Sequence, residues 1–248
     1  MLLAYDEDVI REIVEFTKDQ FIKNFHNYRD KYLIYKVVHY KAYNLYDAYT
    51  IIFVDKSSWL GFRIETSYFD RDKVYSRRRH FITIHNESLK AYDVRLLRFL
   101  GYRIEYPRDL GSISEVKERI RYVVDRIFIF DLEPFINYYR RLLNEIFARF
   151  KWFKNLYSEI GEYLYNNGVR FLIKVDATVS EFSGLTVQFD NSLELNIYRT
   201  INGKYNISVT LKHNTFLDEV DGNIIKTFVD TCLSIRDLVK IIDNVLKG

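Results

Sequence analysis

The sequence of 248 residues contains one cysteine, Cys232, and two prolines. A single cysteine excludes an internal disulfide framework, and without a Cys-x-x-Cys pair or a Cys/His cluster a structural zinc ion has no ligands. No run of about 18 apolar residues occurs, and Met1 is soon followed by acidic residues instead of a basic and then apolar leader. We therefore expect a soluble, cytoplasmic protein of a reducing compartment, with no membrane among its partners.

Familiar catalytic signatures are missing as well. The chain has no P-loop and no G-x-G-x-x-G, H-E-x-x-H or G-x-S-x-G motif, which disfavours Walker-type nucleotide hydrolysis and the commonest hydrolase designs. The histidines are isolated in the sequence, so none of them indicates a metal site or the base of a nucleophile. The nine glycines are scattered, and no flexible linker marks a domain boundary.

The composition is that of an ordinary globular protein, with 48% hydrophobic and 29% charged residues, enough for one core or two. The 37 Lys and Arg residues nearly balance the 34 Asp and Glu residues, so the whole protein has no strong field of one sign. Any surface that binds nucleic acid must therefore be local.

Apolar periodicity divides the first half of the chain into helices and strands. Helical spacing predicts a helix from Asp6 to about Phe25. Three runs rich in Tyr, Val and Ile, at 32–41, 47–54 and 59–66, predict an antiparallel meander, with residues 55–58 as a hairpin turn.

The remainder of this half predicts a second mixed segment. A short apolar run at 81–84 precedes a predicted helix over 88–100, which ends where Gly101 frees the backbone. A strand at 102–106 follows, and an S-x-x-E capping box opens a helix over 112–128. The expected order for residues 1–130 is α-β-β-β-α-β-α.

A second unit, 131–248, is expected beyond a boundary at 130/131. It begins with a long apolar-striped helix over 134–165 and ends with a helix over about 222–246, on which Cys232 is predicted to be a buried, unreactive thiol. Between them lie four alternating strands in an antiparallel meander, at 169–175, 182–189, 193–201 and 204–212. The fold class is α+β, and the two halves share a loose helix, sheet, helix plan without a residue-level repeat.

The outward face of this second sheet is expected to be polar. Its members alternate along the strands with the apolar residues, and they are Arg170, Lys174, Asp176, Gln188, Glu194, Asn196, Tyr198, Asn206, Ser208, Thr210 and Lys212. Such a face is usually solvent-facing, and it is also a candidate binding surface.

A family resemblance is carried by residues 88–107 and 112–120, which read SLKAYDVRLLRFLGYRIEYP and SISEVKERI. This helix, "L-G-Y-R-I" strand and final helix resemble the closing part of compact restriction-endonuclease-like PD-(D/E)xK modules, such as the very-short-patch-repair endonucleases and the RAP domains. The resemblance covers residues 1–130. It implies either an Mg²⁺-dependent nuclease or a relative that only binds nucleic acid.

The resemblance also implies a catalytic pair, Asp47 and Glu65, which would hold the Mg²⁺ ion. Ser67 stands where the family has a lysine, and Lys36 or Lys73 would have to supply a migrated cation. If all of residues 55–58 form the turn, the two acids fall on opposite faces, and a bulge or a different turn length is needed to unite them. The other interpretation is that both acids are solvated and paired with a nearby Lys or Arg.

Positive charge is concentrated in residues 21–80, which carry 12 Lys and Arg against 6 Asp and Glu, a balance of +6. Its peak supplies the predicted phosphate contacts: Lys73, Arg77, Arg78 and Arg79. Arginine forks suit phosphates, and the tyrosines of the preceding strands suit unpaired bases. Equally, these arginines fit a solvated loop, and the tyrosines fit core and edge packing.

The sequence thus predicts a protein that binds nucleic acid, DNA or RNA, with or without Mg²⁺-dependent cleavage. The alternative is a non-enzymatic assembly protein that self-associates, for example as a homodimer, through the apolar stripes of helix 134–165 and of the last helix.

Overall fold

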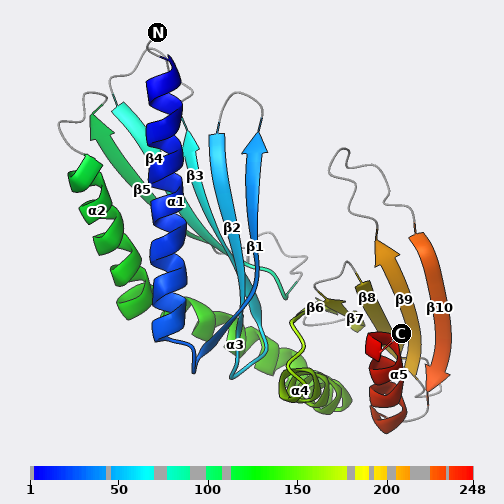
Figure 1. Ribbon diagram of the computed structural model, residues 1–248. Helices are drawn as coiled ribbons and strands as arrows, with labels where there is room; N and C mark the ends of the chain where they lie inside the picture. Colours follow the sequence, from blue (N-terminus) through cyan, green and yellow to red (C-terminus); the bar gives the residue numbers. More distant parts are fainter. Residues whose placement is uncertain are drawn as a thin grey trace. The chain divides into compact units, whose positions relative to one another are not determined.

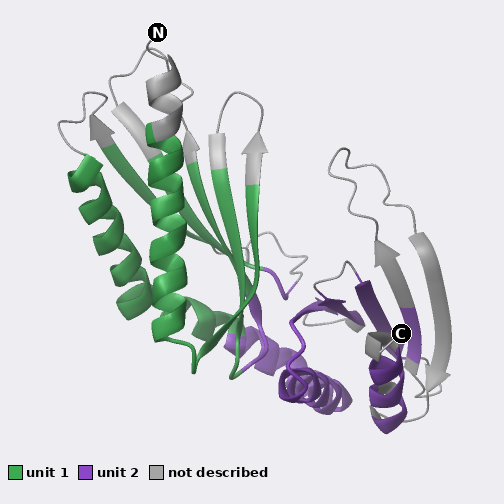
Figure 2. Ribbon diagram, viewed as in Figure 1, with its two compact units in different colours: residues 1–57, 62–86, 98–139 green, residues 58–61, 87–97, 140–248 purple. Residues whose placement is uncertain are grey.

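The structure is a computed structural model. It describes residues 3–42, 46–69, 77–89, 99–107, 113–177, 182–189, 193–199, 205–212, 224–232 and 235–247. The chain forms two compact units: unit 1 comprises residues 1–57, 62–86 and 98–139, and unit 2 comprises residues 58–61, 87–97 and 140–248 (Figure 2). None of the described helices is long and apolar enough to cross a membrane.

Unit 1 is built on a five-stranded sheet whose spatial order, β1-β2-β3-β4-β5, is the order of the sequence. The strands are β1 (Tyr32–Ala42), β2 (Tyr46–Asp55), β3 (Gly61–Phe69), β4 (Arg77–Asn86) and β5 (Leu100–Pro107). Pairs β1–β2, β3–β4 and β4–β5 are antiparallel. The connection 56–60 between the neighbouring strands β2 and β3 is too short for a parallel crossover, so the sheet is an antiparallel meander.

Helices α1 (Leu3–Asn27) and α2 (Ile113–Arg126) lie across one face of this sheet (Figure 1). The core between them is aromatic. Phe53 of β2 is fully buried, and its ring lies 4.7 Å from Phe25 of α1 and 5.6 Å from Phe62 of β3. Strand alternation explains the arrangement, since residues of β3 with the parity of Phe62 face the helices and those between them face away.

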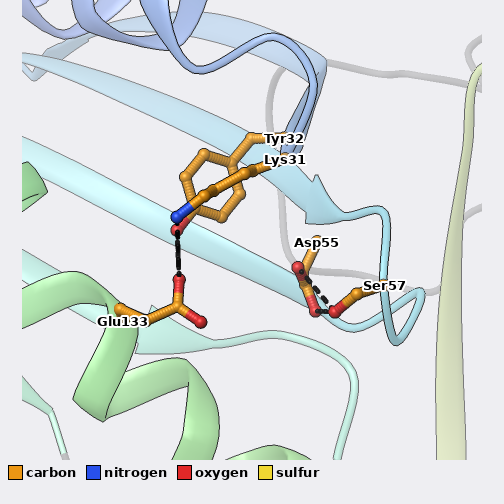
Figure 3. Close-up of polar contacts among 5 residues, drawn as sticks. All are labelled: Lys31, Tyr32, Asp55, Ser57 and Glu133. Carbon is orange, nitrogen blue, oxygen red and sulfur yellow. Dashed lines mark hydrogen bonds and ion pairs between the residues drawn. The ribbon is translucent and has the colours of Figure 1, made fainter.

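Polar groups close the end of the sheet nearest α3 (Figure 3). Asp55 is fully buried, and the Ser57 hydroxyl donates to its two carboxylate oxygens at 3.3 and 3.0 Å. The Tyr32 hydroxyl donates to Glu133 at 3.2 Å, and the Lys31 ammonium lies 3.9 Å from the same carboxylate oxygen. The Ser57 hydroxyl thus gives the buried Asp55 side chain a hydrogen-bond partner, as a buried polar group requires.

A continuous helical run follows α2. It passes through a π-helical segment, η2 (Ile127–Asp131), into α3 (Leu132–Arg149). The wide π turn shifts the helical phase: Ile127 and Phe128 are buried, whereas Ile129 and Phe130 are 58% and 67% exposed. The expected boundary at 130/131 falls inside this run, and the structure instead divides the two units within α3, at 139/140.

Unit 2 contains α4 (Lys151–Asn166), α5 (Ile235–Lys247) and a second five-stranded antiparallel meander, ordered β10-β9-β8-β7-β6. Its strands are β6 (Phe171–Ala177), β7 (Phe182–Phe189), β8 (Leu193–Arg199), β9 (Tyr205–Lys212) and β10 (Ile224–Cys232). The Tyr163 hydroxyl of α4 donates to Asp243 of α5 at 3.1 Å. Both units therefore follow one plan: a helix, a five-stranded meander and a helix.

Two short segments from far earlier in the sequence complete the edge of the second sheet. Leu60 and Leu89 form parallel bridges with Ile173 and Val175 of β6. The buried Ser88 hydroxyl accepts from the Gly61 amide at 2.6 Å and donates to the Ile173 carbonyl. These contacts pair the edge of β6, which would otherwise present unpaired backbone groups.

The structure confirms the α+β class and corrects several elements. Residues 77–86 form a full strand, because His80, Ile82 and Ile84 alternate into the core. The helix expected over 88–100 is wrong at both ends: Ser88 and Leu89 are bound to β6, and Leu100 begins β5. Residues 90–98 of that helix lie outside the described residues.

The second half needs three corrections. The helix expected over 134–165 is two helices, α3 and α4, because the backbone leaves helical geometry at Phe150 (φ −115°, ψ 68°). The first part of the helix expected over 222–246 is strand β10, rich in β-branched residues, and only 235–247 is helical. Accordingly the sheet has five strands rather than four. Cys232 pairs with Tyr205 in β10, while the environment of its thiol lies outside the described residues.

Candidate nucleic-acid interface

The candidate interface is the face of the first sheet that points away from α1 and α2. Phe62 and Ile64 of β3 are fully buried against the helix side, so Arg63 and Glu65 stand on the other face. In β4 the same parity places Thr83 and His85 there, in register with Glu65 and Arg63. The side chains of Arg63, Glu65 and His85 are 36%, 38% and 31% exposed, as on an open sheet face.

Charges on this face are paired, within a strand or between neighbouring strands. Arg63 Nη1 lies 3.0 Å from Glu65 Oε1, and His85 Nε2 lies 3.9 Å from Glu65 Oε2. On β5, Arg103 is paired with Glu105 in the same i, i+2 arrangement. Each arginine is thus held extended along its strand by a carboxylate. Because these pairs are partly solvated, each contributes little to stability and exchanges easily for another anion.

An aromatic surface adjoins these pairs. The Phe99 ring stacks on His85, with ring centroids 5.9 Å apart and planes inclined by 22°. Phe99 is 62% exposed, an unusual position for a large apolar ring. The stack presents a flat ring beside one cationic group, Arg63, which pairs in register with His85; a ring next to a cation is the combination that binds unpaired bases and their phosphates.

The predicted catalytic residues do not gather on this face. Glu65 is present and paired with Arg63. Lys36 of β1 pairs with Ile52, on the same face as Glu65 but two strands away. Position 47 of β2 stands two residues before Tyr49, whose ring faces Lys18 of α1 at 4.8 Å. Regular alternation therefore separates positions 47 and 65, and the side chain of Asp47 lies outside the described residues.

The predicted basic segment is partly a strand. Arg77, Arg78 and Arg79 open β4, where Arg79 pairs in register with Phe69 and with Glu105. Their side chains, and the whole of Lys73, lie outside the described residues. Position 79 has the parity of 81, 83 and 85, so the arginine run continues the strand that forms the middle of the candidate interface.

The described residues supply one carboxylate near the predicted Mg²⁺ position, Glu65, whose Oε1 lies 3.0 Å from Arg63 Nη1. The side chain of the second predicted ligand, Asp47, lies outside the described residues, so the Mg²⁺ site stays an expectation. A Mg²⁺ ion needs oxygen ligands without a competing cation. Among the described residues no group of three or more His, Cys, Asp or Glu is placed to hold a metal ion, and we derive no hydrolytic step.

Comparison with known proteins yields no match to a family, to a curated protein or to a solved structure. The resemblance to restriction-endonuclease-like modules stays an expectation. Sequence reasoning missed Phe99, because it assigned residues 88–100 to a helix, and it did not single out Arg103, although it placed this residue in the strand 102–106. A signal was available for β4 alone: the alternation of His80, Ile82 and Ile84 marks a strand longer than the apolar run at 81–84.

Proposed function

We propose that unit 1 binds single-stranded nucleic acid across the open face of its sheet, without hydrolysing it. The observation that carries the proposal is the exposed Phe99 ring stacked on His85, beside the Arg63–Glu65 pair. A base stacks on the ring, and the phosphate that follows it takes the place of Glu65 on the Arg63 guanidinium. Base stacking on an aromatic ring contributes about 1–3 kcal/mol per base.

Two features favour a single strand over a duplex. The ring of Phe99 offers its π-face to one base, which is accessible only when the base is unstacked. Among the described side chains of the face, the cations Arg63, Arg103 and Lys36 outnumber the anions Glu65 and Glu105 by one, a modest excess that suits a short tract. The arginine run at the start of β4 adds positive charge along the same strand.

The test is fluorescence anisotropy with labelled oligothymidylate and oligouridylate, and with a duplex of mixed sequence, at two salt concentrations. The parent protein should bind the single strands more tightly than the duplex. Phe99→Ala should weaken single-strand binding about tenfold, which corresponds to the removal of one stacked base. Tyr165→Ala is the matched control, because Tyr165 is 39% exposed on α4, in unit 2; it should leave binding unchanged.

Charge is tested separately. Replacing Arg77, Arg78 and Arg79 with Ala should weaken binding to all sequences and flatten the plot of log K against log salt by about 0.7 for each phosphate that the variant no longer binds. A control replaces three exposed cations, Arg149, Lys151 and Lys154, and removes the same net charge. Equal weakening in both triple variants would reduce the effect to net charge and reject a role for the β4 arginines.

Cleavage has its own outcome. We expect no Mg²⁺-dependent cleavage of single- or double-stranded substrates by the parent protein, and Asp47→Ala should bind as well as the parent or better, because it removes a negative charge. Cleavage by the parent that disappears in Asp47→Ala would reject the binding-only function and restore the nuclease expectation.

A second candidate function, self-association, is favoured by one specific observation. Tyr122, Ile129 and Phe130 are 68%, 58% and 67% exposed along one continuous helical run, from α2 into η2. A second copy of the chain would cover these three side chains. Light scattering of the parent and of Ile129→Ser/Phe130→Ser decides: a dimer that becomes a monomer supports it, and a parent that stays monomeric at high concentration rejects it.

A further inference from the structure

A polar hollow of about 260 Å³ lies on the outward face of the second sheet, wholly within unit 2. Strands β6, β7 and β8 line it, with Lys174, Asp176, Gly184, Thr186, Gln188, Glu194, Asn196 and Tyr198. Their alternation with the buried residues Ile173, Val175 and Leu185 places them on the face that the sequence predicted to be polar. We propose that this hollow binds a neutral polyhydroxylated ring, a monosaccharide or one sugar unit of a longer chain.

The lining is organised before any ligand arrives. The Thr186 hydroxyl donates to Asn196 Oδ1 at 2.8 Å, and the Gln188 amide donates to Glu194. These bonds join the paired positions 186–196 and 188–194 of β7 and β8. Glu194 is only 9% exposed. Fixed amides and carboxylates of this kind lose little side-chain freedom on binding, which favours recognition.

One acceptor in this lining is unsatisfied. Asp176 Oδ1 is buried and makes no hydrogen bond, and Asp176 is one of the residues that line the hollow. A buried acceptor without a partner costs about 1–3 kcal/mol. A ligand hydroxyl that donates to this oxygen would recover that cost.

Tyr198 supplies an aromatic wall. It is 45% exposed, and its ring crosses to the neighbouring strand over Gly184. A Cβ at position 184 would come within 2.6 Å of Tyr198 Cδ1 and Cε1, so only glycine lets the ring lie in this place. The C–H face of a sugar ring packs on such an aromatic face, while its hydroxyls reach the polar groups beside it.

The chemistry of the lining selects the ligand class. Donors and acceptors are both present, and a hydroxyl serves as donor and acceptor at once. One lysine faces two carboxylates, so the hollow carries a net negative formal charge, which disfavours phosphates and nucleotides. The volume is below the roughly 300–1,000 Å³ of drug-sized pockets, which fits a single ring.

Saturation-transfer difference NMR on the full chain tests the proposal. The probes are glucose, galactose, mannose and N-acetylglucosamine at millimolar concentration, with uridine and inorganic phosphate as rival ligands (phosphate monitored through the phosphorus spectrum). At least one sugar should show transfer to its ring protons. Tyr198→Ala should weaken its binding about tenfold, whereas Tyr198→Phe, which keeps the ring, should bind like the parent.

Two more variants separate the site from general destabilisation. Asp176→Asn should weaken binding of the same sugar, and Gly184→Ala, which displaces the tyrosine ring, should weaken it as well. Glu159→Gln on α4 is the matched control, since Glu159 is an exposed carboxylate. Melting curves of all variants establish folding. The proposal is overturned if none of the four sugars binds, if sugar binding survives Tyr198→Ala, or if uridine or phosphate occupies the hollow in their place.

Discussion

Thr17 and His80 meet in the core of unit 1, with Thr17 Oγ1 and His80 Nε2 3.3 Å apart and both residues fully buried. The Thr17 hydroxyl hydrogen is donated to the Ile13 carbonyl at 2.7 Å, so its oxygen can only accept from the imidazole. This assigns the neutral tautomer with the proton on Nε2. His80 Nδ1 is buried without a hydrogen-bond partner, and a second proton there would have no acceptor.

This arrangement predicts a pH-dependent stability. Burial lowers the pKa of His80 from 6.5 to about 4, so between these pH values the unfolded chain binds a proton that the folded chain does not. The free energy of unfolding should therefore fall as the pH drops from 6.5 to about 4, by up to about 3 kcal/mol from this residue. Above pH 6.5 the contribution is constant.

Urea unfolding of the parent and of His80→Gln across this pH range measures the effect. Glutamine does not titrate and keeps a donor for Thr17. The free energy of unfolding should decline less steeply with falling pH in the variant than in the parent. The difference between the two curves separates the contribution of His80 from that of carboxylates that titrate in the same pH range. Parallel curves would show that His80 is protonated in the folded state.

The aromatic core predicts the cost of a large cavity. Phe53 is fully buried among the rings of Phe25, Tyr32 and Phe62, and Phe53→Ala should lower the free energy of unfolding by about 3–5 kcal/mol. Val37→Ala is the comparison, because Val37 is 39% exposed on β1, and it should cost about 0.5 kcal/mol or less. Chemical denaturation gives both values, and similar losses would contradict the described core.

At Gly161 we predict that substitution by alanine destabilises the protein, although the same substitution stabilises most helices. Alanine in place of a helical glycine normally stabilises by about 1 kcal/mol. At position 161 of α4, however, a Cβ would overlap the indole ring of Trp59, and overpacking of this kind costs about 1–3 kcal/mol. Gly161→Ala should therefore destabilise the protein and shift the fluorescence of Trp59, read in a Trp152→Phe background. A stabilised variant with unchanged emission would place Trp59 elsewhere.

Removal of the Ser88 hydroxyl should clearly lower the free energy of unfolding. The group is fully buried and bonds both the Gly61 amide and the Ile173 carbonyl. Ser88→Ala leaves a buried donor and a buried acceptor with one partner fewer, and should cost about 1–3 kcal/mol. Hydrogen exchange at the Gly61 amide should also accelerate. Ser158→Ala, on α4, is the control and should be nearly neutral.

Periodicity predicted the first helix, the first three strands and the strands β6 to β9, because each has a regular pattern of buried residues over a full element. Periodicity failed where one apolar stripe runs through two consecutive helices, and where the apolar residues of a strand also fit a helical pattern. The stripe through 134–165 continues across Phe150, where only the backbone angles reveal a break. Residues 224–232 contain Ile224, Ile225, Phe228 and Val229 at helical spacing. The pairing of this segment with β9 is a non-local contact that no local pattern contains.

The candidate sites show the same division. The polar face of the second sheet was predictable, since alternation alone assigns Lys174, Asp176 and Glu194 to it. The hollow was not, because it depends on Gly184 standing beneath Tyr198 of the next strand. On the first sheet, Phe99 lies just before β5, and its stacking on His85 depends on the register between β4 and β5.

The pairing of β6 with residues 58–61 and 87–89 has a consequence for synthesis. Both segments leave the ribosome before β6 is made, so the pairing partners of this strand are already synthesised when it emerges. A C-terminal fragment of residues 140–248 would contain all of the second sheet and neither segment. Its β6 would have an open edge, and open edges recruit strands from other molecules. The fragment of residues 140–248 should therefore aggregate. A peptide of residues 58–61 or of residues 87–89 alone would restore one of the two bridges to β6 and not the other.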